Sequence, residues 1–210
     1  MATLNATNLK HASSGSNNIV LAADGSTTIS NLSNAGKILQ VANSTYNGQT
    51  SLTLTSAYSN NDSNIYYVTQ LDTTLTTTKA NSKILISGMI AGEFSNPDHL
   101  FGFIMSSTIG GTTAPIDTLR GTSSNNRVKL SFLPSVGYHG DDNASTPFST
   151  PFSNFYYAPS QAAGTAITMR LGVVSTYYSS QTFKINQAYD TTNNDEREHL
   201  VSFMTLMEIS

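Results

Sequence analysis

The residues best suited to chemistry are histidines with carboxylates beside them. His99 directly follows Asp98, and His139 is followed closely by Asp141 and Asp142. An imidazole beside a carboxylate can serve in acid–base catalysis or in a metal site. No second ligand stands at a recognised metal-binding spacing from either pair. We therefore interpret all four histidines as solvated or hydrogen-bonded loop residues: His11, His99, His139 and His199.

Nucleophilic and glycosidic catalysis lack their usual signatures. The chain has no Cys, no Gly-x-Ser-x-Gly elbow and no Ser-x-x-Lys pair. A glycosidase needs two carboxylates that face each other across a sugar. Glu93 with Asp98 or Asp117 could supply such a pair, but nothing in the sequence selects it. We predict a protein that is not an enzyme, and a hydrolase would require carboxylates to converge in the Glu93–Asp117 region.

The acidic segment Asp190–Glu198 carries oxygen ligands of the kind that calcium prefers. It lacks the glycine at the sixth position and the terminal glutamate spacing of an EF-hand loop. We interpret it as a surface turn, and we expect no metal ion and no other cofactor.

The composition is polar but poor in charge. Charged residues make up 11% of the 210 positions, whereas Ser, Thr and Asn number 29, 28 and 20. The net charge is −3 and there is no basic run, so we expect no nucleic-acid partner. No apolar stretch is long enough to span a membrane. The first residues show no signal-peptide pattern, so we expect no secretion signal.

The hydrophobic pattern predicts strands. Ile167, Met169, Leu171 and Val173 alternate with polar or small residues, which is typical of a strand with one buried face. Turn-rich clusters separate such runs. The sequence therefore predicts an all-β fold, an antiparallel jelly roll or β-sandwich. Less regular alternation marks the other expected strands, at 52–55, 65–71, 83–91, 100–105, 128–133, 182–189 and 200–209.

The first 35 residues differ from the rest because they contain neither Phe nor Tyr. Ile19 and Leu21, then Asp24-Gly25, then Thr27 and Ile29 predict a small hairpin. A two-stranded piece is marginal alone in water, so it needs a partner surface. We place the boundary after Ala35, with an N-terminal arm at 1–35 and the β domain at 36–210.

The segment Pro134–Pro159 concentrates prolines and aromatic side chains. Because proline removes a ladder donor, we expect a long ordered loop or an excursion at a sheet edge. Its rings could cap the end of the sandwich or form a contact surface for a partner or a host. The candidate contact residues are Tyr138, Phe148, Phe152, Phe155, Tyr156 and Tyr157.

Strand-opening and strand-closing patterns mark both ends of the chain. They lie at 7–14 with 18–21, at 36–41 with 82–86, and in the closing strands at 166–171, 183–186 and 203–209. In these stretches the chain resembles small structural proteins of marine and cyanobacterial tailed bacteriophages. The resemblance leaves residues 92–165 largely unmatched.

This resemblance implies a trimeric jelly roll, like the domain of tumour necrosis factor and C1q, at the tip of a fibre or spike. The chain would then be a homotrimer located in the virion. Its arm would dock on other virion proteins of the tail or capsid, and its β domain would adhere to the host, through a surface glycan for instance. The candidate docking residues are Leu9, Ile19, Leu21 and Ile29.

Two alternatives stay open. Within the same class, the chain could be a capsid decoration or head-fibre protein, because its arm is a single short element rather than a long stalk. In another class, it could be a soluble lectin-like carbohydrate-binding module, which would have a compact sugar or calcium site and no docking arm.

Overall fold

The computed structural model divides the chain into two compact units, Met1–Lys37 and Ile38–Ser210. This division lies close to the boundary predicted after residue 35. The structure describes residues 8–9, 12–13, 19–21, 23, 27–29, 37–59, 62–96, 100–122, 127–134, 147–177, 179–189 and 198–210.

The N-terminal unit contains a small antiparallel sheet of three very short strands. These are β1 (Asn8–Leu9), β2 (Ile19–Leu21) and β3 (Thr27–Ile29), in that spatial order. Ile19 stands opposite Ile29, so the hairpin predicted from the alternating residues is confirmed. Strands of two or three residues make few ladder hydrogen bonds, so packing must supply most of their stability.

The larger sheet of the β domain is organised around its longest strand, β8 (Lys83–Phe94). On one side β8 pairs first with β14 (Ser202–Ile209) and then with β13 (Gln181–Ile185). On its other side it pairs with β11 (Phe148–Tyr157). The sheet is completed by β4 (Ile38–Tyr46) beside β14 and by β5 (Thr50–Leu54) beside β13.

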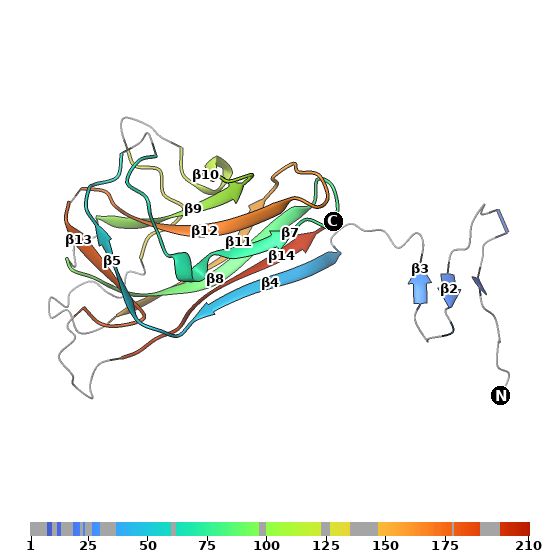
Figure 1. Ribbon diagram of the computed structural model, residues 1–210, viewed down its shortest axis with the longest axis horizontal. Coiled ribbons are helices and arrows are strands. Elements are labelled where there is room, and N and C mark those ends of the chain that lie inside the picture. The colour runs from blue at the N-terminus through green and yellow to red at the C-terminus, as the bar shows by residue number, and fades with distance from the viewer. Residues whose placement is uncertain are drawn as a thin grey trace. The chain divides into compact units, whose positions relative to one another are not determined.

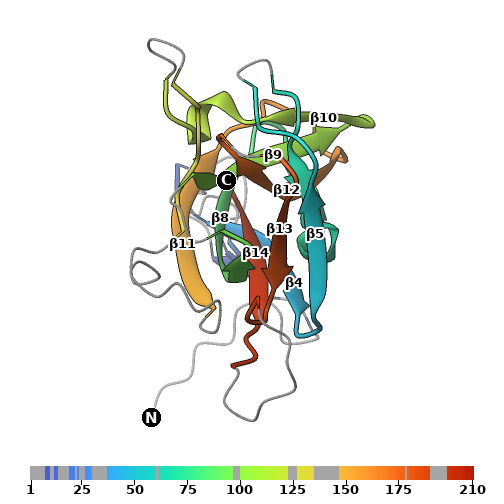
Figure 2. The same ribbon diagram turned by 90° about the vertical axis from the view of Figure 1, so that its left-hand side faces the viewer.

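The second sheet faces the first (Figures 1 and 2). Its central pair is β9 (Phe101–Ile109) with β12 (Ala166–Ser175). The short strand β10 (Thr112–Pro115) extends it beyond β9, whereas β6 (Tyr66–Tyr67) and β7 (Thr73–Thr76) both pair with the far side of β12. The described part of the domain also contains the 3-10 helices η1 (Thr69–Leu71) and η2 (Asp117–Leu119).

The core lies between the two sheets and is rich in phenylalanine. The ring of Phe94 stacks on that of Phe101, with centroids 4.0 Å apart, and it also contacts Phe183. The alternating residues predicted for β12 are all fully buried: Ile167, Met169, Leu171 and Val173. The predicted antiparallel β-sandwich is confirmed.

Three predicted elements need correction. The expected strand at 128–133 is only an isolated bridge between Phe132 and Phe103, because the Ser131 hydroxyl accepts the Met105 N–H in place of a backbone carbonyl. The strand expected at 65–71 is β6 followed by η1.

The third correction concerns Pro134–Pro159, whose second half is the ten-residue strand β11 and not a loop. Among the described strands β11 pairs only with β8, so it lies at a sheet edge, where Pro151 is tolerated. In the view of Figure 2, β11 and β5 lie at opposite margins of the β domain. The predicted excursion to a sheet edge is therefore confirmed, whereas the predicted loop is wrong for the second half of the segment, Phe148–Tyr157.

Candidate functional site

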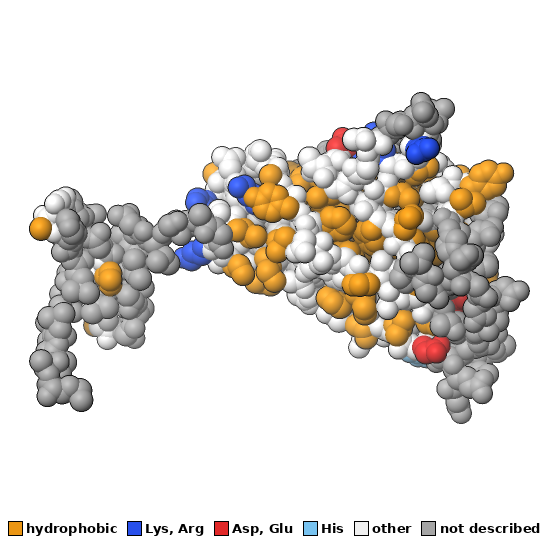
Figure 3. All heavy atoms as spheres, turned by 180° about the vertical axis from the view of Figure 1, so that it is seen from behind, with side chains coloured by type: hydrophobic (Ala, Val, Ile, Leu, Met, Phe, Trp, Pro, Cys, Tyr) orange, Lys and Arg blue, Asp and Glu red, His pale blue; other side chains and the backbone are white. Residues whose placement is uncertain are grey.

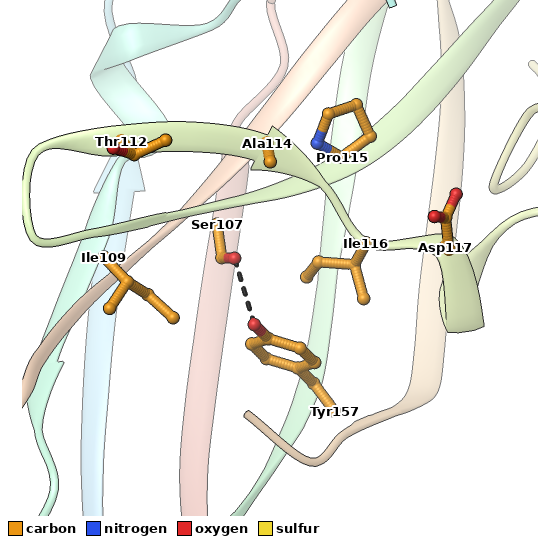
Figure 4. A pocket seen from close by; sticks show the side chains of 8 residues that line it. All are labelled: Ser107, Ile109, Thr112, Ala114, Pro115, Ile116, Asp117 and Tyr157. Atoms are coloured by element: carbon orange, nitrogen blue, oxygen red, sulfur yellow. Dashed lines mark hydrogen bonds between the residues drawn. The ribbon is translucent and has the colours of Figure 1, made fainter. Parts of the chain in front are cut away.

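A groove follows η2 where β10 and the end of β11 approach each other. Its first cavity has a volume of about 360 Å³. Figure 4 shows the ring of Tyr157 beside this cavity, with its hydroxyl directed at Ser107 of β9, 3.1 Å away. The hydrogen bond fixes the ring between the two sheets. The lining residues are Ser107, Ile109, Thr112, Ala114, Pro115, Ile116, Asp117 and Tyr157.

Two further cavities continue the groove along η2. One, of about 370 Å³, includes Arg120, Asn154 and Tyr156, and the other, of about 260 Å³, includes Lys129. Asp117 lines the first and third cavities, and Gly121 lines the second and third, so the three adjoin. Aliphatic side chains and the Tyr157 ring line much of the first cavity, and the other two add hydroxyls, the Asn154 amide and charged groups. Such a lining can hydrogen-bond a polar ligand and pack against its apolar faces.

The groove is held in place by Arg120, whose side chain is only 3% exposed. Its two terminal nitrogens donate to both oxygens of Asp62, and Nε donates to Oδ1 of Asp117 at 2.8 Å. The Tyr58 hydroxyl donates to Asp62 Oδ1 at 2.7 Å. η2 is thereby tied to the segment that carries Asp62, far away in the sequence.

The electrostatics of this cluster are those of a structural ion pair. The hydrogen bonds from Arg120 hold the pKa of Asp62 below its usual range, although burial opposes them. Burial and the bond to Asp62 raise the pKa of the Tyr58 hydroxyl above its ordinary value. Asp62 therefore stays ionised and Tyr58 stays neutral near pH 7, so neither is poised to transfer a proton in that range.

The carboxylates considered for catalysis have separate environments. Glu93 is buried on β8, and its Oε2 accepts the backbone N–H of Tyr189. Asp117 is 78% exposed on η2 and is paired with Arg120. Glu93 lines none of the three cavities described above. Asp98 lies outside the described residues.

Of the histidines, the structure describes only His199, an exposed residue bridged to Gln187. His11, His99 and His139 lie outside the described residues, as does most of Asp190–Glu198. Among the residues that are described, no three His, Cys, Asp or Glu side chains group together as a metal site. In the same part of the chain, no helix has the length and apolar character needed to cross a membrane.

The predicted contact aromatics separate into two groups. Phe148 and Phe152 are 4% and 5% exposed and belong to the core, so for these two the contact prediction is wrong. They face inward because β11 alternates its side chains across the sheet. Phe155, Tyr156 and Tyr157 line the groove, and Tyr156 is 47% exposed. Tyr138 lies outside the described residues.

The sequence prediction missed most of the groove. In the sequence, Asp117 stands out only as half of a possible catalytic pair, and Ser107, Thr118 and Asn154 carry no local signal. The candidate docking residues lie in the N-terminal strands: Leu9 in β1, Ile19 and Leu21 in β2, and Ile29 in β3.

No protein-family model and no curated protein matches this chain. Among solved structures it is similar to the infectious bursal disease virus VP2 subviral particle, with 13% identity over 83% of this chain and 38% of that one, and a TM-score of 0.30. The structure of the Gx strain of the same virus is similar with 14% identity over 81% of this chain and 37% of that one, and its TM-score is 0.27. The chain thus spans little more than a third of the length of these proteins. At such TM-scores the likeness transfers no function, and the fold assignment rests on the strand pairings described above.

Proposed function

We propose that this chain is a non-enzymatic structural protein of a virion, docked through its N-terminal unit and displaying its β domain outward. The observation that carries the proposal is the division into Met1–Lys37, with its short-stranded sheet, and the self-contained sandwich of Ile38–Ser210. An arm that has neither Phe nor Tyr, and whose described strands have two or three residues, needs a surface to order it. The resemblance of both chain ends to bacteriophage structural proteins also supports an N-terminal unit that docks and a β domain that is displayed.

In this proposal the chain is a homotrimer and contacts other virion proteins through β1, β2 and β3. Its low charged fraction of 11% suits close packing between neighbouring subunits, because few charges must be desolvated. The outward β domain then meets the host. Both a location on the tail and a location on the capsid would allow the arm to dock and the β domain to face outward.

The experiment compares particle incorporation of the full chain with that of Ile19→Asp, which places a charge in β2 opposite Ile29. We expect the variant to be lost from purified particles because the docking sheet cannot form, while the far-UV circular dichroism of the β domain is retained. Thr53→Asp, at an exposed position on β5, is the matched control and should incorporate normally. Normal incorporation of Ile19→Asp would refute docking through this sheet.

The groove along η2 favours a second candidate, a lectin-like carbohydrate-binding function. Asp117 exposes its carboxylate there, and Tyr157 supplies a fixed aromatic ring beside hydroxyl groups. Carboxylates accept hydrogen bonds from sugar hydroxyls, and aromatic rings pack against the C–H faces of sugars. The direct test is a binding screen with neutral and acidic oligosaccharides. Binding that Thr118→Ala weakens and the exposed control Thr53→Ala preserves would support it, whereas absence of binding to every saccharide would reject it.

A further inference from the structure

The outer face of the larger sheet carries apolar side chains in register across four strands. The pairings place Tyr156 opposite Leu85, Leu85 opposite Met207, and Met207 opposite Val41. None of the four is buried, and Val41 is 57% exposed. Directly opposed side chains on one face have Cβ atoms about 5 Å apart, so this row is continuous across the sheet.

Two more rows flank it. One consists of Pro151, Met89, Phe203 and Thr45, and the other of Lys83, Ile209 and Ile38. Lys83 is the one charged residue in these rows, and its Nζ lies over the Tyr156 ring, 5.6 Å from the centroid. In the view of Figure 3, apolar side chains form several groups over the body of the β domain, with charged ones mainly near its margins. We call these three rows the apolar sheet face.

A polar row lies between the apolar rows, and at Asn43 and Thr205 its side chains are hydrogen-bonded within the sheet. It consists of Asn43, Thr205 and Ser87, in register on β4, β14 and β8. Asn43 donates from Nδ2 to the Thr205 hydroxyl at 2.9 Å and to the Met204 carbonyl at 3.3 Å. The Thr45 hydroxyl donates to the Asn43 side-chain oxygen. Covering this row therefore leaves the Asn43 amide with partners, which removes the usual cost of burying a polar group.

We propose that a second copy of this chain covers the apolar sheet face. The face has no carboxylate and a single ammonium, so it makes no demand for an oppositely charged partner. A covering surface must itself be poor in charge, because each charge placed there would lose water without gaining a partner. Another copy of this chain meets that condition, with 11% charged residues against roughly 25% in an ordinary soluble protein.

The size of the face is also suitable. Four strands about 4.8 Å apart, with about seven residues each at about 3.3 Å per residue, cover roughly 440 Å² of the sheet plane. The accessible surface of projecting side chains is larger than this projection. It is therefore of the same order as the roughly 800 Å² that each partner contributes to a standard interface. The inference deepens the proposed function by naming the surface through which subunits meet.

The test is the mass of the full chain in solution, measured by sedimentation equilibrium between nanomolar and micromolar concentrations. We expect the wild-type chain to exceed the monomer mass of 22.4 kDa at micromolar concentration. Val41→Glu and Met207→Glu should each weaken association at least about thirtyfold, because a buried unpaired carboxylate is placed in the contact. Thr53→Glu, at an exposed position on β5 away from the face, is the control and should associate like the wild type.

Two results would overturn the proposal: a wild-type chain that stays monomeric at micromolar concentration, or face variants that associate unchanged. Val41 lies exposed on β4, which has one pairing partner among the described strands, so Glu is tolerated there in the folded monomer. Its thermal unfolding at nanomolar concentration verifies this. Ile19→Asp distinguishes this proposal from the proposed docking function. It should abolish incorporation into particles but leave the association of the chain in solution intact. Val41→Glu should instead weaken association in solution.

Discussion

The guanidinium of Arg120 binds both carboxylate oxygens of Asp62, although the two residues are 58 positions apart in the sequence. This pair joins η2 to the segment after β5, and the Tyr58 hydroxyl completes it. The groove keeps its shape because the buried guanidinium of Arg120 binds Asp62 and Asp117 at the same time.

Asp62→Asn is expected to lower the free energy of unfolding by about 2 kcal/mol, because Arg120 stays nearly buried with less compensation for its charge. The measurement is the urea midpoint at constant slope. Asp117→Asn removes the more exposed partner and should cost less than about 1 kcal/mol. Equal losses in both variants would contradict the assignment of Asp62 as the main partner.

Glu208 predicts a specific dependence of stability on pH. Burial raises the pKa of this carboxyl, but hydrogen bonds from Ser82, Gln40 and Thr78 outweigh burial and hold the pKa below its ordinary value. Its stabilising contribution is therefore complete above the unfolded pKa and is lost as the pH falls through the lower folded pKa.

The corresponding variant is Glu208→Gln, which should cost about 2 kcal/mol at pH 7 because charge-assisted hydrogen bonds are lost. The difference from the wild type should shrink as the pH falls below the ordinary glutamate value of 4.5. Glu198→Gln, at an exposed position, is the control and should leave the free energy of unfolding at pH 7 nearly unchanged. A difference that stays constant down to pH 3 would show that the ionised form is not what stabilises the fold.

Phe152 and Tyr156 lie in the same strand but should respond differently to truncation. Phe152→Ala empties a core site that packs against Phe132, with ring centroids 5.2 Å apart, and should cost about 3–5 kcal/mol. Tyr156→Ala should leave the melting temperature of the dilute protein nearly unchanged, because this residue is 47% exposed and lies outside the core. The measurement is calorimetry at low protein concentration. A large loss for Tyr156→Ala would place that ring in the core.

Asn186 joins three segments through one buried amide. Its Nδ2 donates to the carbonyls of Tyr46 and Gly48, and its Oδ1 accepts the Ser202 hydroxyl. Asn186→Ala should cost about 2–4 kcal/mol, since it orphans these groups at a backbone φ of 61°. Asn186→Gly loses the same bonds but keeps the backbone relaxed, so the difference in unfolding free energy between the Ala and Gly variants, measured by chemical denaturation, reports the backbone strain.

The strands could be predicted because each has a pattern within its own sequence. Ile167–Val173 alternates cleanly, and β12 is buried on the predicted face. The alternation pattern gave a wrong prediction at Ser131, whose hydroxyl accepts a backbone N–H that a strand partner's carbonyl would otherwise accept. It also missed the strand that contains Pro151, which is tolerated there because the strand lies at a sheet edge. Hydrophobic alternation contains neither piece of information.

The groove could not be predicted, because its residues come from four separate stretches of sequence. Asp117 and Arg120 are three residues apart and carry a local signal, but their partner Asp62 is found only through the fold. Tyr157 meets Ser107 across 50 positions. Likewise, the rows of the apolar sheet face depend on register between strands, which no single strand specifies.

The irregular edge of β11 has a consequence for a protein held at high local concentration. Pro151 offers no N–H to a neighbouring chain, and the bulge between Phe152 and Phe155, with Asn154 at a φ of 60°, bends the strand. An incoming strand would find a missing donor and a kink within a few residues, so it could not extend the sheet. At this edge, crowded copies therefore cannot join their sheets strand to strand.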